Sequence, residues 1–278
     1  SNEEGFYHLS RDAYDYFWIL WGLIIAIISL IFNAIAWREL VDWLGYRRST
    51  IHFIPLFLSS NLLKYLPGGI WHFIDRLRSL RNEIGVGPAL ASVFLEPFLM
   101  LVAAFLLIPF GGLKSGFALV CLLPLLLLTA PFREPLLRFL ERNKTKQLIK
   151  VDSSFSSAFS SENLFVVRSP YPFKALAIEV LFILFRFASF FCCLLAFSTA
   201  SYLPLGTWVS IFSFAWAVGL VIPAAPGGLG VFEAALLLGL GSTATGMPLL
   251  GILFGYRLIT TLADIVAALI FPIQRKLL

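Results

Sequence analysis

The feature that most constrains this chain is an uncharged run of 21 residues, from Phe17 to Trp37. A helix of that length spans the roughly 30 Å hydrocarbon core of a bilayer. Tyr and Trp residues cluster at the ends of the run, as they do at membrane interfaces. Further long apolar runs cover 88–110, 175–199 and 248–271, and shorter ones cover 51–66, 116–131 and 207–222. The pattern predicts an all-α, polytopic membrane protein.

The composition agrees with lipid as the surrounding solvent. Hydrophobic residues make up 59% of the chain and charged residues 13%, whereas about a quarter of the residues of soluble proteins are charged. The net charge of +5 does not indicate nucleic acid as a partner, because the basic residues lie in short loops between apolar runs. The three cysteines lie within apolar runs and the three histidines lack ligand spacing. We therefore expect no disulfide framework, no metal and no cofactor.

The chain is expected to form one membrane domain, 1–278, made of two halves. A polar, Ser-rich segment over 132–174 lies between a first half of about 17–131 and a second half of 175–273. Such a composition is typical of a linker.

Each half contains an apolar run that is interrupted by Pro-Gly-Gly, a string that cannot continue a regular helix. The interruptions read Pro67-Gly68-Gly69-Ile70-x-x-Phe73 and Pro226-Gly227-Gly228-Leu229-x-x-Phe232. Broken backbone at membrane depth persists only where it is buried in protein or lines a polar cavity. Paired interruptions in corresponding places of two halves point to a transporter-type binding site. Two unrelated helix kinks are the alternative interpretation.

The distribution of Lys and Arg decides between two topologies. If the run 51–71 enters and leaves the membrane on one side, loops 38–50, 73–87, 132–174 and the C-terminal tail share a face with 16 Lys and Arg, against two on the other face. Positive charge marks the cytoplasmic face, so these loops and the C-terminus are predicted to be cytoplasmic. The second interruption must then enter from the opposite face. The fold predicted is therefore two halves with inverted, re-entrant Pro-Gly-Gly hairpins.

Residues 73–84 alternate apolar positions with charged ones at helical spacing. Asp75, Arg76, Arg78 and Arg81 are among the charged positions. This pattern predicts a helix with a basic face that lies at the membrane interface.

Six charged residues lie in or at the ends of apolar runs: Glu96, Glu179, Arg186, Glu233, Arg257 and Asp264. Each charge costs about 2.5–3.5 kcal/mol at the bilayer centre, so it needs a partner or a wet cavity. We expect Glu179 and Arg186, seven residues apart, to pair with neighbours. Glu233 and Arg257 are predicted to line a shared cavity that opens toward lipid, where they bind a charged headgroup or neutralise each other.

Four strings carry a resemblance to a known family: Leu66-Pro67-Gly68-Gly69 followed by Asp75-Arg76, the run 91–96, Pro226-Gly227-Gly228-Leu229-Gly230-x-x-Glu233, and Tyr256-Arg257-Leu258. Together they resemble the membrane region of lysylphosphatidylglycerol synthase/flippase proteins over roughly residues 17 to 273. The resemblance implies a polytopic helical domain with re-entrant segments that translocates aminoacylated phospholipids between leaflets. Carried over by residue, the polar site comprises Arg76, Glu96, Glu233 and Arg257. With the two interruptions, the predicted lipid-binding set also contains Pro67, Gly68, Gly69, Pro226, Gly227 and Gly228.

The sequence also departs from that family. Pro97 and Met100 stand where the family often has Arg and an acid after Glu96, so we expect a thinner polar network there. We expect the family's first helix to be missing, which would place the N-terminus outside. The soluble aminoacyl-transferase domain is absent from the sequence, so the resemblance does not imply lysyl transfer.

The function predicted from the sequence is that of a lipid translocase or lipid-binding transporter in the cell (inner or plasma) membrane. Its partners would be membrane lipids: an anionic or aminoacylated phospholipid, or a lipid-linked glycan. Homo-oligomer formation and the identity of the lipid stay open. One alternative is a non-catalytic membrane subunit of cell-envelope lipid or glycan biosynthesis. Another is a membrane transferase on a lipid-linked substrate, but no D-x-D, P-loop or His cluster supports an enzyme.

Overall fold

The computed structural model describes residues 2–46, 52–67, 70–112, 121, 123–129, 171–222, 230–244 and 248–271, and the regular elements in these ranges are helices. Four of the helices are long and apolar enough to cross a bilayer. They are α1 (Asn2–Trp43), α4 (Val86–Leu107), α8 (Phe173–Ala196) and α11 (Leu249–Ile270). Because they cover most of each of the four long apolar runs, the prediction of an all-α, multi-pass membrane protein is confirmed.

The interrupted runs form pairs of shorter helices. The pairs are α2 (Phe53–Asn61), continued by the 3-10 turn η1 (Leu62–Tyr65), with α3 (Trp71–Ile84), and α9 (Leu205–Val221) with α10 (Val231–Leu240). The nine residues of α2 extend only about 14 Å. Residues 51–73 are therefore not one spanning helix.

Short elements complete the described chain. They are η2 (Ile108–Gly111), α6 (Pro124–Leu127), η5 (Ala200–Tyr202) and η7 (Gly241–Ala244). Half of the run 116–131 lies outside the described residues, and its described part contains the single turn α6. The short span expected there stays a prediction.

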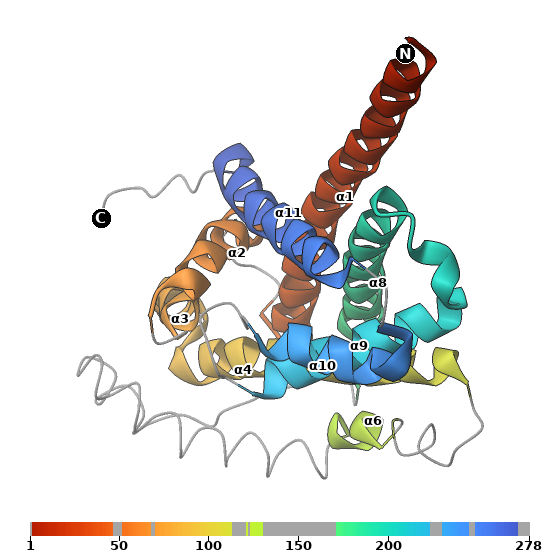
Figure 1. Ribbon diagram of the computed structural model, residues 1–278. Helices are drawn as coiled ribbons and strands as arrows, with labels where there is room; N and C mark the ends of the chain where they lie inside the picture. The colour runs from red at the N-terminus through yellow and green to blue at the C-terminus, as the bar shows by residue number, and fades with distance from the viewer. Residues whose placement is uncertain are drawn as a thin grey trace.

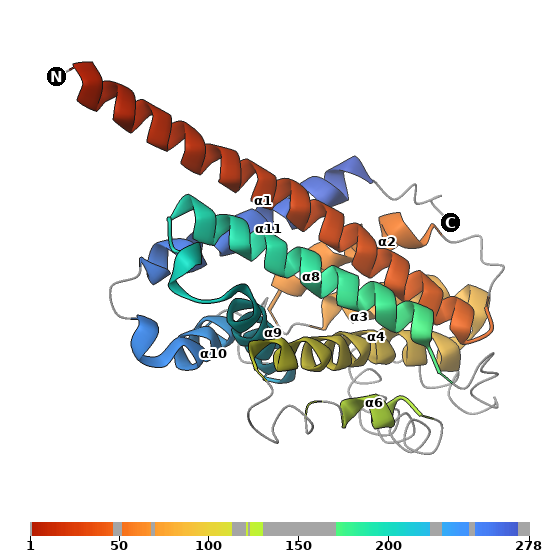
Figure 2. The same cartoon turned by 90° about the vertical axis from the view of Figure 1, so that its right-hand side faces the viewer.

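The ends of the long helices gather at two ends of the bundle (Figure 2). The C-terminal ends of α1 and α11 and the N-terminal ends of α4 and α8 lie at one end. The α2–α3 pair follows α1 and joins α4 through Gly85 alone, so both ends of this pair connect at that same end. The α9–α10 pair lies between the end of α8 and the start of α11, so it connects at the opposite end.

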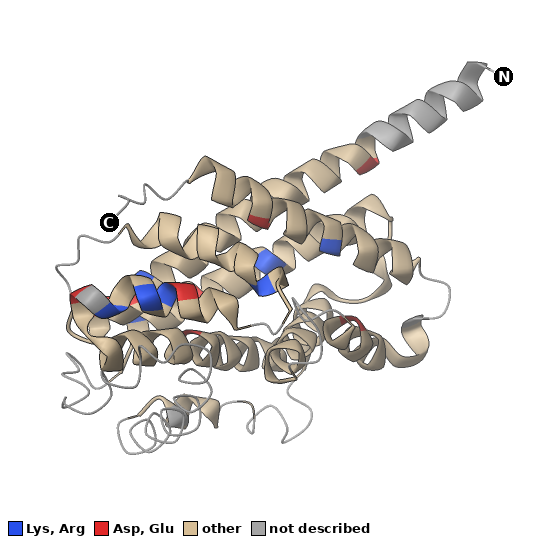
Figure 3. Ribbon diagram, turned by 90° about the vertical axis from the view of Figure 1, so that its left-hand side faces the viewer, with Lys and Arg blue, Asp and Glu red and all other residues tan. Residues whose placement is uncertain are grey.

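The predicted helix at 73–84 is present as α3, and Ile74, Leu77 and Leu80 on it are buried. The assignment of Arg76 to a basic surface face was wrong, because this side chain is only 1% exposed. Arg76 shares the inward face with the apolar positions because it has a buried acidic partner on α4. In Figure 3, charged positions gather on α3 and toward the centre of the bundle, while most of the described helical ribbon has none.

The most extensive packing between two helices joins α1 to α8, which lie side by side in Figures 1 and 2. Gly22 permits the close approach, since a Cβ atom there would lie 3.3 Å from the Cβ of Cys192. The hydroxyl of Ser189 donates a hydrogen bond of 2.8 Å to the carbonyl of Gly22. The three cysteines are buried and free of disulfides, as expected of packing residues.

Two further positions set the shape of the bundle. Pro97 lies inside α4, where it cannot donate the usual hydrogen bond to the carbonyl of Val93. Gly206, near the start of α9, lies against η2, and a Cβ atom there would be 2.4 Å from the carbonyl oxygen of Phe110. α4 is therefore locally weakened in its middle and held tightly to α9 at its end.

Candidate functional site

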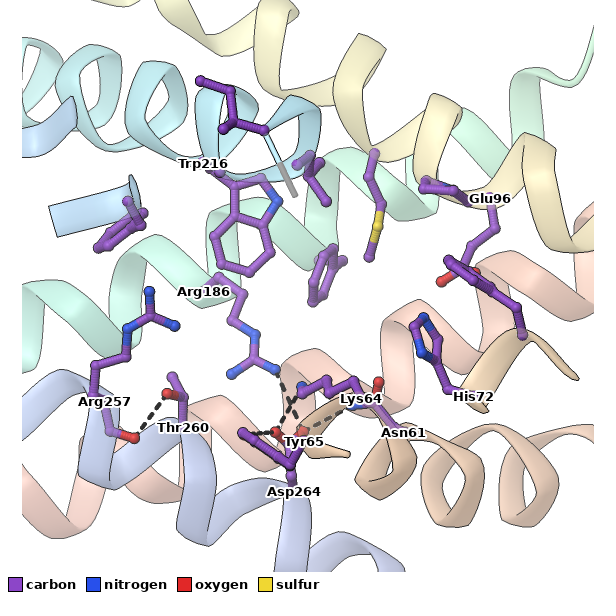
Figure 4. A pocket seen from close by; sticks show the side chains of 18 of the residues that line it. Asn61, Lys64, Tyr65, His72, Glu96, Arg186, Trp216, Arg257, Thr260 and Asp264 are labelled. Carbon is purple, nitrogen blue, oxygen red and sulfur yellow. Dashed lines mark hydrogen bonds and ion pairs between the residues drawn. The ribbon is translucent and has the colours of Figure 1, made fainter. Parts of the chain in front are cut away.

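A cavity of about 350 Å³ lies among the helices, within the size range of small-molecule sites. Its walls come from α2, η1, α3, α4, α8, α9, α10 and α11. Lys64 and Tyr65, which precede the first Pro-Gly-Gly, line it together with Ile222 and Phe232, which flank the second. The two interrupted segments, distant in sequence, therefore border one cavity (Figure 4).

Of the two Pro-Gly-Gly strings, Pro67 is the residue that lies within the described part of the chain. Gly68, Gly69, Pro226, Gly227 and Gly228 lie outside the described residues. Pro67 is exposed and is not among the lining residues. Its carbonyl accepts a hydrogen bond of 2.8 Å from the indole nitrogen of Trp71, which joins the two sides of the break.

Asp264 on α11 holds the first interrupted segment in place. Its carboxylate lies 2.7 Å from the ammonium of Lys64 and accepts hydrogen bonds from the hydroxyl of Tyr65 at 2.6 Å and the amide of Asn61 at 2.8 Å. All four side chains line the cavity, and Figure 4 shows them converging on one carboxylate. Because Asp264 is 1% exposed, this cluster fastens η1 to α11 inside the bundle.

Arg186 on α8 enters the cavity from the opposite wall and points toward Asp264 (Figure 4). Its Nη2 lies 4.0 Å from the carboxylate. Its Nε and Nη1 are buried and have no hydrogen-bond partner in the described part of the chain. Arg186 thus pairs with Asp264, as expected of a charge in an apolar run, but only at 4.0 Å. Its Nε and Nη1 remain available to donate hydrogen bonds to a bound group.

Glu179 on the same helix does not show the expected pairing. Both of its carboxyl oxygens are buried and without a hydrogen-bond partner among the described residues. It does not line the cavity. Glu179 is therefore a buried acid of the bundle interior rather than part of this site.

Arg76 and Glu96, two of the four residues implied by the resemblance, form a buried ion pair on another wall. The Nη1–Oε2 distance is 2.7 Å. The Nε of Arg76 donates to the hydroxyl of Ser60 at 2.9 Å, and its guanidinium lies 3.8 Å from the ring centroid of Phe57. The pair joins α3 to α4, and both side chains line the cavity.

Glu233 and Arg257, the other two, are also brought into contact. Glu233 accepts a hydrogen bond from the Nε of Arg257, and its second oxygen accepts one of 2.8 Å from the backbone of Gly230. It therefore caps the start of α10, where a negative charge is favoured. Arg257 lines the cavity and Glu233 is not among the lining residues. The carboxylate positions the arginine rather than facing the cavity itself.

Aromatic side chains cover the wall between these charged groups. Phe182, Trp216, Phe232 and Tyr256 all line the cavity. Their ring centroids are 5.7 Å apart for Phe182 and Trp216, 6.5 Å for Trp216 and Phe232, and 5.7 Å for Phe232 and Tyr256. The indole nitrogen of Trp216 and the hydroxyl of Tyr256 have no hydrogen-bond partner in the described residues.

Sequence reasoning did not assign Lys64, Arg186, Trp216, Tyr256 or Asp264 to the site. The signal for Arg186 and Asp264 was their charge within apolar runs, but nothing in a single sequence indicates that Lys64 and Arg186 both approach Asp264. Among the residues that the structure describes, no group of three or more His, Cys, Asp or Glu could hold a metal ion. The chemistry that the site offers is recognition by charge and hydrogen bonds.

Comparison with known proteins gives a family match. The family model described as "Lysylphosphatidylglycerol synthase TM region" matches residues 9–268, a range that includes every described residue of the cavity. No curated protein and no solved structure gave a significant match.

Proposed function

The chain belongs to the lysylphosphatidylglycerol synthase TM-region family, and from this premise we propose that it is a lipid translocase, which moves a phospholipid or lipid-linked substrate between leaflets. The observation that carries the proposal is the charged cavity between the two interrupted segments. A polar cavity inside a membrane bundle lets a headgroup leave water without entering hydrocarbon.

Inverted, re-entrant hairpins are part of this proposal. The α2–α3 pair connects at one end of the bundle and the α9–α10 pair at the other, and residues next to both breaks line the cavity. This arrangement supports two hairpins that enter from opposite faces and meet near the middle of the membrane. With the positive-inside rule, it supports a cytoplasmic position for the segments 38–50, 73–87 and 132–174 and for the C-terminus. Of these segments, 38–43 continue α1 and 73–84 belong to α3.

Lys64 and Arg257 support access to the cavity from outside the bundle. Their side chains are 25% and 24% exposed, while Arg76, Arg186 and Asp264 are almost fully buried. A headgroup would pass from the partly exposed cations to the buried ones while its acyl chains stay in lipid. Arg257, held by Glu233, can bind a phosphate as a two-pronged donor.

The proposal is tested by reconstitution of the purified protein into liposomes that contain fluorescent phospholipids. Dithionite, added outside, bleaches the outer leaflet at once and the inner leaflet only as lipid is translocated. We expect wild type to accelerate the slow phase and Arg257→Ala to abolish most of that gain for anionic lipids. Glu233→Gln should slow translocation of the same anionic lipids to a smaller extent, because Glu233 positions Arg257, while the protein stays folded.

The matched control is Leu250→Ala on α11, because Leu250 is 82% exposed and lies outside the cavity. This variant should translocate lipid at the wild-type rate. Wild-type protein that performs no better than empty liposomes, with any headgroup, would refute translocation. That result would favour the non-catalytic subunit of cell-envelope biosynthesis instead.

A further inference from the structure

The cavity contains more hydrogen-bond donors than its own acceptors use. The Nε and Nη1 of Arg186, the indole nitrogen of Trp216 and the hydroxyl of Tyr256 all lack a partner among the described residues, and all three side chains line the cavity. Arg186 and Tyr256 are only 3% and 2% exposed. Buried polar groups are nearly always hydrogen-bonded in folded proteins. Their convergence on one cavity therefore indicates a bound group that accepts several hydrogen bonds.

The acids of the cavity, in contrast, are already engaged. Of the described lining residues, only Glu96 and Asp264 carry a carboxylate. Glu96 is paired with Arg76, and Asp264 with Lys64. A cationic headgroup would have to displace one of these cations from a buried partner. The cavity has no carboxylate among its described residues that is reserved for an ammonium.

The net charge of the lining points the same way. Four cationic side chains face two carboxylates, and the lining cations are Lys64, Arg76, Arg186 and Arg257. Counting Glu233 behind Arg257 still leaves one positive charge in excess among these groups. The buried acid Glu179, which lies outside the lining, also interacts electrostatically with Arg76. The excess therefore applies to the groups that face the cavity, where a bound anion would compensate it.

The aromatic wall could in principle hold a quaternary ammonium, as aromatic cages do. Here two of the rings already lie beside guanidinium groups of the protein itself. The guanidinium of Arg186 lies 5.6 Å from the ring centroid of Phe182, and that of Arg257 lies 5.5 Å from the ring centroid of Phe232. A choline group would meet positive charge beside these rings, so the cage does not suit it.

We infer that the cavity selects an anionic lipid headgroup whose phosphate is bound by Arg186, Trp216 and Tyr256, and that it excludes aminoacylated and other cationic headgroups. The inference rests on the proposed function in that it names the lipid class which the same cavity takes. Phosphate oxygens accept several hydrogen bonds at once, and a guanidinium matches two of them. The headgroup that fits is a phosphate with hydroxyl substituents or none, as in phosphatidylglycerol or phosphatidic acid.

The test measures binding without translocation, so that the two proposals can fail separately. The purified protein in a neutral detergent is titrated with fluorescent phosphatidylglycerol, phosphatidic acid, phosphatidylcholine and lysyl-phosphatidylglycerol, and anisotropy reports the bound fraction. We expect the two anionic lipids to bind at least about tenfold more tightly than the other two. Inorganic phosphate is added as a competitor, and displacement of the lipids by it at low concentration would reveal a site for the free ion, which would overturn the assignment to lipid.

Three variants locate the phosphate. Tyr256→Phe removes one donor and almost no volume, Trp216→Phe removes the indole donor together with part of the ring system, and Arg186→Lys keeps the charge but loses the two-pronged geometry of the guanidinium. Loss of a hydrogen bond to a charged group predicts about tenfold weaker binding of the anionic lipids for each variant. Tyr202→Phe is the control, because Tyr202 is 55% exposed and lies outside the cavity. It should bind like wild type.

Besides displacement by inorganic phosphate, two further results would overturn the inference. The first is equal or tighter binding of lysyl-phosphatidylglycerol, which would leave lipid translocation itself intact. The second is unchanged binding by Tyr256→Phe, Trp216→Phe and Arg186→Lys, each folded by gel filtration and melting, which would mean that water alone satisfies these donors. Selective binding of anionic lipids without any translocation in liposomes would instead refute the proposed function and support the binding site.

Discussion

Breaking the ion pair between Arg76 and Glu96 should destabilise the bundle far more than replacing both residues. Single replacements by Met leave one charge buried without its partner, at a site where Arg76 is 1% exposed. Removing one partner of a buried ion pair costs about 3–5 kcal/mol, whereas exchanging the whole pair for apolar residues is close to neutral. Met suits both positions because its flexible chain fills irregular space.

The magnitude follows from the geometry. The Nη1–Oε2 distance of 2.7 Å places the charge centres about 4 Å apart, which corresponds to an attraction of about 4 kcal/mol at an effective dielectric constant of 20. Arg76→Met also leaves the hydroxyl of Ser60 without its donor. Glu96→Met leaves the guanidinium with no carboxylate, in contact with the hydroxyl of Ser60 and the rings of Phe57 and Trp37. The double replacement removes both charges together. We therefore expect a coupling energy of about 3 kcal/mol or more.

The assay is thermal unfolding of the three variants in detergent, followed by the fraction that stays monodisperse after heating. Each single variant should melt about 6–20 °C below wild type, from about 2–4 °C per kcal/mol for a chain of this size. The double variant should recover most of that loss. If the decrease in melting temperature of the double variant equals the sum of the two single decreases, the two residues are not coupled. That result would refute the reasoning.

Three further predictions use the same melting assay. Asp264→Asn should lower the melting temperature by at least about 5 °C, since it leaves the ammonium of Lys64 unpaired; a melting curve that overlays wild type would contradict the buried cluster. Glu179→Gln should leave the melting temperature unchanged or raise it, because the carboxyl has no hydrogen-bond partner among the described residues; a large decrease would show that it has one. Gly206→Ala should destabilise by about 1–3 kcal/mol through its clash with the carbonyl of Phe110, and a neutral result would mean that η2 and α9 separate easily.

The long apolar runs predicted the four helices that can span a bilayer. They follow from runs such as 17–37, because a single apolar span of this length can satisfy its backbone polar groups in lipid only as a helix. The break at Pro67 follows from local stereochemistry. By contrast, the basic face assigned to 73–84 was wrong at Arg76. Periodicity identifies which residues share a face, but it cannot show that a buried acid on another helix makes an inward arginine favourable.

The site was predictable only where charge alone was the signal. Glu233 and Arg257 stood out as charges in apolar runs, and the structure brings them into contact. The partner of Asp264 was not predictable, because Lys64 is 200 residues away and tertiary packing alone brings the two together. The unused donors of Tyr256 and Trp216 have no signature in a sequence, since aromatic residues in an apolar run are indistinguishable from packing residues.

Pro97 also affects how the cavity can change shape. Every other turn in the middle of α4 must break a backbone hydrogen bond to bend, whereas the turn before Pro97 has already lost one. The residue before it is Glu96, and Pro97 itself lines the cavity. The C-terminal end of α4 is fixed by close packing, because Gly206 of α9 lies directly against the carbonyl of Phe110. We therefore expect α4 to bend most easily beside the ion pair of Arg76 and Glu96. Bending at that point would change the volume that the cavity offers to a headgroup.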